Sequence, residues 1–213
     1  MVVVFEGRPD RAAEVILLGR SNVGKSTLMR RLTGRSVPTG RRPGVTTEPT
    51  YHDWAEANFL LTDLPGFGFM AGVPEARRER IKTSIVRYIE AHADAIAVGV
   101  LVLDGAAAVE IIDRHLDKGD PPYVLELYDL LVDLDIQPVI AVNKMDKVDE
   151  RDATLDAIAE RFGLTPPWQQ WRDYIAPITA KDGRIDPLLH ALYDHLEAAG
   201  YGQVRGVLPS PHQ

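Results

Sequence analysis

The stretch GRSNVGKST, residues 19–27, comes directly after the apolar run AEVILLG at residues 13–19. It fits the pattern G-x-x-x-x-G-K-[ST], in which glycines let backbone N–H groups turn inward around phosphates. Lys25 would bring a positive charge to the outer phosphates, and the Ser26 hydroxyl would ligate Mg²⁺. The alternative is a glycine turn with an incidental lysine. A strand before the motif and a helix after it favour a phosphate-binding loop.

The chain alternates short apolar runs with longer amphipathic segments, which predicts an α/β fold. Buried strands are expected at residues 13–19, 58–63, 95–104 and 136–144, with a weaker one at 174–179. Helical spacing occupies residues 25–33, 75–91, 122–134, 150–162 and 185–199. This order indicates a mostly parallel sheet with helices on both faces, a three-layer sandwich whose ligands bind at the carboxyl ends of the strands.

The expected organisation is one domain over residues 1–200 with a flexible tail over 201–213. Residues 34–50 form a long loop rich in Gly, Pro and Thr, which is either mobile or ordered by a ligand. The chain has 213 residues, no cysteine and a net charge of −7. This charge disfavours a protein that coats DNA, and no apolar segment approaches the length of a membrane span. We expect a cytoplasmic monomer without a membrane anchor.

The segment DLPGFGFMAG, residues 63–72, ends the second expected strand. Asp63 could hold Mg²⁺ directly or through water, and the alternative is an ordinary turn or capping aspartate. Gly66 lacks a side chain that would block its own N–H from the outermost phosphate. The segment is therefore expected to sense a third phosphate.

The segment NKMD, residues 143–146, follows the strand PVIAV and indicates which base is bound. The Asp146 carboxylate can accept the ring N–H and the exocyclic amine of guanine, whereas adenine would leave it poorly paired. Asn143 would bond the acceptor edge of the base or brace the phosphate loop, and the stem of Lys144 would cover one ring face. In TAK, residues 179–181, the Ala180 N–H would meet the guanine oxygen. These motifs predict GTP and GDP as ligands.

Together these motifs resemble a Ras-like P-loop GTPase of the TrmE-Era-EngA-EngB-septin class. The combination of GRSNVGKSTLMRRLTG, RPGVTTEP, DLPGFGFMAGVP, NKMDK and TAK is most similar to the EngB (YihA) family, and VPEARRERIKTSIVRYIE with PPWQQW resembles its archaeal branch. The resemblance implies a GTPase in large-ribosomal-subunit assembly, associated with normal cell division and septation. Pre-ribosomal particles or ribosomal RNA are the implied partners, and the basic residues Arg77, Arg78, Arg80 and Lys82 are a candidate RNA contact, alternatively a solvated helix surface.

The resemblance also assigns Thr46 as the switch threonine that reaches Mg²⁺ and the outer phosphate, with Thr47 as the alternative. The catalytic residues are then Lys25, Thr46 and Gly66, and the Mg²⁺ ligands are Ser26, Thr46 and Asp63. The nucleotide-binding residues are Gly19, Arg20, Ser21, Asn22, Val23, Gly24, Lys25, Ser26, Thr27, Gly44, Val45, Thr46, Asp63, Leu64, Pro65, Gly66, Asn143, Lys144, Asp146, Thr179, Ala180 and Lys181.

Phe67 occupies the position at which Ras-like enzymes carry a glutamine that orients the attacking water. A phenyl ring cannot orient water, so we expect slow intrinsic hydrolysis. Three substitutes are open: K⁺ bound beside Asn22, the loop at 34–50, or a partner. The competing hypothesis is a GTP-binding interaction protein in cell division with negligible turnover.

Overall fold

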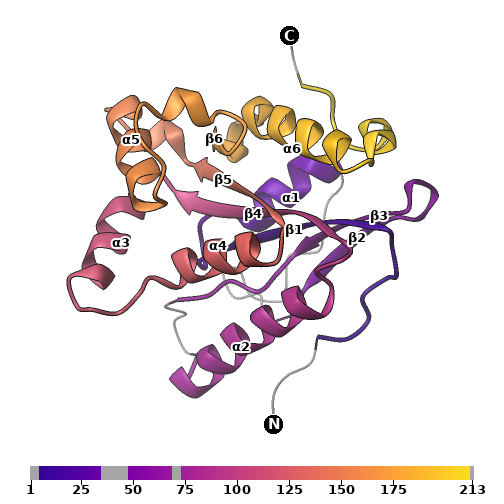
Figure 1. Ribbon diagram of the computed structural model, residues 1–213, viewed down its shortest axis with the longest axis horizontal. Helices are drawn as coiled ribbons and strands as arrows, with labels where there is room; N and C mark the ends of the chain where they lie inside the picture. Colours follow the sequence, from indigo (N-terminus) through magenta and orange to yellow (C-terminus); the bar gives the residue numbers. More distant parts are fainter. Residues whose placement is uncertain (1–4, 35–47, 69–72, 212–213) are drawn as a thin grey trace.

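A six-stranded sheet forms the centre of the molecule in the computed structural model, which describes residues 5–34, 48–68 and 73–211 (Figure 1). The strand order is β2-β3-β1-β4-β5-β6. β2 pairs antiparallel with β3, and the other neighbouring pairs are parallel. The strands are β1 (Ala13–Gly19), β2 (Thr50–Trp54), β3 (Phe59–Asp63), β4 (Ile96–Asp104), β5 (Gln137–Asn143) and β6 (Ile175–Pro177).

Helices cover both faces of the sheet, which confirms the three-layer prediction. They are α1 (Lys25–Thr33), α2 (Glu75–Ala91), α3 (Ala108–Leu116), α4 (Tyr123–Asp133), α5 (Arg151–Arg161) and α6 (Asp186–Ala198). The 3₁₀ turns are η1 (Ala55–Ala57), η2 (Met145–Lys147), η3 (Trp168–Trp171), η4 (Ala180–Asp182) and η5 (Gly202–Gly206). In the described part of the chain, every helix is too short or too polar to cross a membrane.

Two hydrophobic cores lie on opposite faces of the sheet. Ile16 and Leu18 of β1 belong to the core under α2, α3, α4 and α5, whereas Val15 and Leu17 belong to the core under α1 and α6. Figure 1 shows α1 and α6 together on one side of the sheet, with α2 and α4 on the other. Because side chains alternate along a strand, an uninterrupted apolar run fills both cores.

One strand and one α-helix in the structure were not predicted. β2 is an edge strand with half-buried or exposed side chains, so it has no apolar run, and its Trp54 stacks on Phe59 with ring centroids 5.4 Å apart. α3 buries only Ala108 and Ile112 and begins after a turn in which Asp104 Oδ1 accepts the Ala106 N–H at 3.2 Å. Both elements are stabilised by tertiary contacts that local periodicity does not report.

The described part of the expected tail, residues 201–211, makes contacts with the domain. Residues 202–206 form η5, whose Val204 is fully buried against the core under α6. The Tyr193 hydroxyl donates to the backbone oxygens of Leu208 at 3.0 Å and Pro209 at 2.9 Å. The polar and glycine-rich composition of the segment concealed these anchors.

Candidate nucleotide-binding site

The predicted phosphate and base motifs follow four parallel strands of the sheet, β3 and β1 on one side of β4, and β5 and β6 on the other. The phosphate loop follows β1, residues 63–67 continue from β3, residues 143–146 continue from β5 and residues 179–181 follow β6. These strands are parallel, so their carboxyl ends meet at one edge, which is where open α/β sheets bind ligands. The structure thus brings together segments more than a hundred residues apart.

The phosphate loop has the geometry that its sequence predicts. Gly24 precedes α1 with φ +106°, and a Cβ at this position would lie 2.3 Å from Asn143 Nδ2, so only glycine fits. The ammonium of Lys25 donates to the backbone oxygens of Gly19 at 3.1 Å and Arg20 at 3.3 Å. Burial lowers the pKa of Lys25, and the charge of Asp63 acts in the opposite direction. The side chain of Lys25 is therefore buried and held over the loop, at the position where a phosphate site requires a cation.

Ser26 and Asp63 provide a pair of oxygen donors that fits Mg²⁺. The Ser26 hydroxyl donates to Asp63 Oδ2 at 2.7 Å, while Asp63 Oδ1 is buried and has no hydrogen-bond partner among the described residues. Burial raises the pKa of Asp63, against the Lys25 charge and the Ser26 hydrogen bond. An unpaired buried carboxylate oxygen beside a hydroxyl suits a hard cation that takes its other ligands from phosphates and water.

The segment after β3 lies directly on the phosphate loop. The Phe67 N–H donates to Gly19 O at 3.3 Å, and the Phe67 oxygen accepts the Ser21 N–H at 3.0 Å. A Cβ on Gly66 would lie 2.7 Å from Ser21 Oγ, so a side chain at this position would prevent the contact. The Phe67 ring is buried and meets Tyr123 edge-on at 4.8 Å. Its apolar ring is part of the core, consistent with the expectation that it does not orient water.

Asn143 braces the phosphate loop, one of the two roles that the sequence left open. Its Nδ2 donates to Val23 O at 2.8 Å and its Oδ1 accepts the Ala180 N–H at 3.0 Å, all of them buried. The N–H predicted to meet the guanine oxygen thus donates to Asn143 in this structure, and its role toward guanine stays a prediction. Sequence spacing did not indicate this contact between the two loops.

Asp146 has one carboxylate oxygen engaged and one unpaired. Lys181 Nζ donates to Asp146 Oδ2 at 2.6 Å, whereas Asp146 Oδ1 is buried without a hydrogen-bond partner in the described structure. The hydrogen bond from Lys181 holds the pKa of Asp146 below its ordinary value. The group is thus an ionised acceptor, as recognition of two guanine N–H donors requires.

Two residues of the site were missed from the sequence. Asp104 ends β4; its Oδ1 accepts the Ala106 N–H, and its Oδ2 accepts Lys144 Nζ at 2.6 Å. The same ammonium donates to Asn22 O at 2.7 Å. Arg31 of α1 donates to Ala180 O at 2.9 Å and also to Lys181 O. In the sequence, Asp104 could have been indicated only by its place at the end of an apolar run. Arg31 could have been indicated only as a basic residue on the helix after the phosphate loop.

Some predicted residues lie outside the contacts described so far. Leu64 is buried, and its N–H donates to Leu17 O at 3.1 Å, which continues the pairing of β3 with β1. Thr179 is buried, and its N–H donates to Arg184 O at 2.8 Å. Gly44, Val45 and Thr46 lie outside the described residues, so their roles stay predictions.

Replacing Asn143 with Ala is expected to destabilise the nucleotide-free protein by about 2–4 kcal/mol, because two buried backbone groups lose their partner. Urea unfolding without nucleotide measures this change. Gln170→Ala removes an exposed amide that donates to Thr165 O at 2.7 Å, and it should change the unfolding free energy by no more than about 0.5 kcal/mol. Equal unfolding free energies for the two variants would contradict the bracing role.

A phosphate loop, a carboxylate beside its serine and an aspartate with an unpaired buried oxygen, all at one sheet edge, are the features of a P-loop GTPase. The family model described as 50S ribosome-binding GTPase matches residues 14–144. The chain belongs to this family, and its similarities lie with the EngB proteins, as the sequence motifs predicted.

These similarities extend over most of the chain. A relative from Halobacterium salinarum, named "Probable GTP-binding protein EngB", is 62% identical over 196 residues, covering 92% of this chain and 95% of the relative. The protein of the same name from Methanosarcina mazei is 46% identical over 185 residues, covering 86% and 88%. A crystal structure of a probable GTP-binding protein engB matches with a TM-score of 0.79 and 43% identity, covering 87% of this chain and 100% of that one. The archaeal sources confirm the predicted branch.

Proposed function

We propose that this GTPase is a monomeric molecular switch that acts in the cytoplasm in assembly of the large ribosomal subunit, and thereby in normal cell division and septation. The observation that carries this proposal is the direct contact of Gly66 and Phe67 with Gly19 and Ser21. The loop after β3 touches the phosphate loop directly. The presence or loss of the third phosphate can therefore move the loop after β3 with no other residue relaying the change. The description of the family as ribosome-binding supports the partner.

The described residues suit phosphoryl transfer to water, which depends on positioning and charge neutralisation. Lys25 is the buried positive charge of the phosphate loop, and the Gly66 N–H is proposed to face the third phosphate. Ser26 and Asp63 would hold Mg²⁺, which when bound neutralises charge on the phosphate oxygens. Thr46 is proposed as the further Mg²⁺ ligand. Guanine is proposed to be read by Asp146, with Lys144 along one face of the ring.

Intrinsic hydrolysis is proposed to be slow because Phe67 offers no hydrogen-bonding side chain. Its ring is buried and packs on Tyr123. A second cation beside the phosphates is one way to replace the missing group. Asn22 is exposed at the phosphate loop with φ +70°, and Lys144 holds its backbone oxygen, which leaves the side-chain amide as the proposed K⁺ ligand.

GTP turnover without ribosomes is therefore expected to be faster in KCl than in NaCl at equal ionic strength. Asn22→Ala should remove that difference and leave GDP affinity close to that of the wild type, because the backbone of the loop supplies the phosphate contacts. Phosphate release measures the rates. Equal rates of the wild type in the two salts would contradict the K⁺ site and leave loop 34–50 or a partner as the activator.

Co-sedimentation with large ribosomal particles from the native host tests the switch. We expect strong binding with a non-hydrolysable GTP analogue and weaker binding with GDP or without nucleotide. A double variant, Arg77→Glu with Arg80→Glu, reverses two exposed charges of α2 and should weaken binding, whereas Arg151→Glu on α5 is the matched control. Binding that is equal in all nucleotide states would refute the switch, because a ligand without differential affinity shifts no equilibrium.

A further inference from the structure

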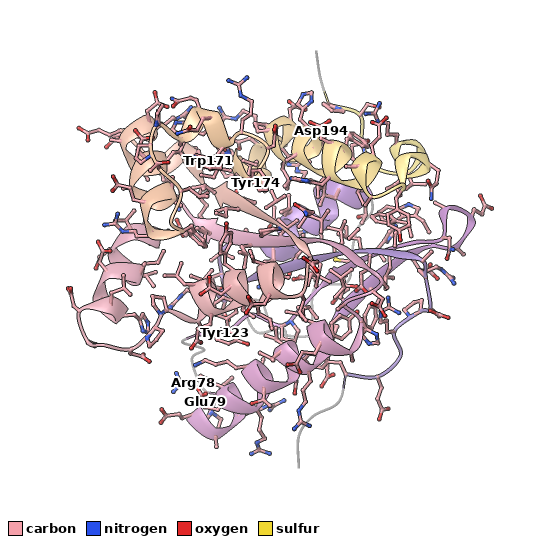
Figure 2. The ribbon with its side chains drawn as sticks, viewed as in Figure 1. Arg78, Glu79, Tyr123, Trp171, Tyr174 and Asp194 are labelled. Atoms are coloured by element: carbon pink, nitrogen blue, oxygen red, sulfur yellow. The ribbon has the colours of Figure 1, made fainter. Side chains whose placement is uncertain are left out.

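A cavity of about 360 Å³ lies between α2 and the segment that joins α3 to α4, next to the loop after β3. Its walls include Phe67 and Gly68 from that loop, Val86 from α2, Ile111 from α3 and Tyr123 from α4. Figure 2 shows Tyr123 at the start of α4, beside Glu79 on the first half of α2. Most of its lining comes from α2 and from residues 111–126, outside the predicted nucleotide-binding residues.

Arg20 is the unusual side chain in this cavity. It follows Gly19 in the phosphate loop, and its guanidinium packs against Gly68, where a Cβ would lie 3.1 Å from Arg20 Cζ. The side chain is half-buried, and among the described residues it has neither a hydrogen bond nor an ion pair. Burial and the charge of Arg114 both lower the pKa of Arg20. A partly desolvated guanidinium of this kind is stabilised when an anion binds it.

Among the described residues, three of the other four charged side chains around the cavity are paired with each other or with His115, and Glu126 is the exception. Lys82 lies 3.0 Å from Glu79, and its ammonium sits 5.2 Å from the centre of the Tyr123 ring. His115 Nδ1 lies 3.0 Å from an Asp120 oxygen. The residues outside the described part of the chain include no aspartate or glutamate. No carboxylate pairs with Arg20 in the described structure, Glu126 included, so its guanidinium is available to an anion from another molecule.

We infer that this cavity binds a carboxylate-bearing side chain of a partner protein, with Arg20 as the anion receptor and Val86, Ile111 and Tyr123 as the apolar wall. The carboxylates of Glu79, Asp120 and Glu126 also line the cavity and would repel the successive phosphates of RNA. One aspartate or glutamate with an apolar neighbour brings a single charge and apolar surface together. The lining therefore favours protein over RNA.

The test uses Mg·GDP-loaded protein and two peptides, N-acetyl-Glu-Phe-amide and its neutral match N-acetyl-Gln-Phe-amide. NMR follows the methyl groups of Val86 and Ile111 and the Nε–H of Arg20. We expect the Glu peptide to shift all three NMR signals and to bind at least about tenfold more tightly than the Gln peptide. Only the Glu peptide can form a charge-assisted hydrogen bond with Arg20. Equal binding of the two peptides, or no shift at these residues, would overturn the inference.

Variants distinguish the role of the cavity in peptide binding from the role of the phosphate loop in GDP binding. Arg20→Gln should weaken the Glu peptide about tenfold, and GDP affinity measured on the same sample shows whether the loop is intact. Thr83→Trp fills the cavity from an exposed position on α2 and should abolish peptide binding, whereas Glu90→Trp lies on the same helix outside the cavity and should not. Peptide binding that survives Thr83→Trp refutes the site. The inference is also refuted if the Arg20 signal does not respond to the Glu peptide but responds to an RNA trinucleotide or to a GTP analogue in place of GDP.

Discussion

Asp146→Asn is expected to weaken GTP and GDP binding by at least roughly 100-fold and to create affinity for xanthosine nucleotides. Guanine presents two N–H donors to this position, and an asparagine can offer only one acceptor, with an N–H facing the other donor. Xanthine has an oxygen in place of the exocyclic amine, so it matches the asparagine amide. The unpaired, buried Oδ1 of Asp146 and its low pKa make the carboxylate the acceptor that guanine requires.

Isothermal titration calorimetry with GDP and with xanthosine diphosphate (XDP) measures the affinity for each nucleotide, and so the change in base specificity. Asp149→Asn removes the same charge from an exposed position three residues further along the chain, and it should leave both affinities close to those of the wild type. The assignment of Asp146 fails if its variant retains GDP affinity, or if it loses GDP without gaining XDP.

The sequence predicted the parts of the fold and site that local chemistry determines. The phosphate loop needs backbone N–H groups from glycines in a strand-loop-helix setting, and all of these lie within one short stretch. The strands buried on both faces carry uninterrupted apolar runs, so β1, β4 and β5 could be placed from residue type alone. Asp63 and Asp146 were identifiable because each follows such a strand.

The remainder depends on contacts between distant segments. β2 is held at the sheet edge by its pairing with β3, and its alternation is too polar to indicate a strand. The sequence suggested only the guanine oxygen as an acceptor for the Ala180 N–H, and the folded structure places Asn143 Oδ1 within reach of it. Arg31 joins α1 to the loop after β6, a contact between residues 149 positions apart that no short motif reports. Pairings at such separations are decided by topology.

Lys25→Met is expected to have opposite effects on ligand binding and on stability. GTP affinity should fall by roughly 100-fold, because the charge that meets the outer phosphates is removed. The nucleotide-free protein should become more stable by about 1 kcal/mol or more, since a buried charge is replaced by an apolar side chain of similar length. The lowered pKa of Lys25 shows that burial already disfavours its charged form.

The pH dependence of this gain separates the charge from simple packing. A lysine whose folded pKa lies below its unfolded value destabilises the fold fully at pH below the folded pKa, and the penalty fades as the pH rises toward the unfolded value. The stability difference between Lys25→Met and the wild type should therefore shrink as the pH is raised. Thermal unfolding without nucleotide at several pH values measures it, with the exposed Lys118→Met as the control. A variant that is less stable than the wild type at neutral pH would show that the two backbone hydrogen bonds of Lys25 outweigh the burial of its charge.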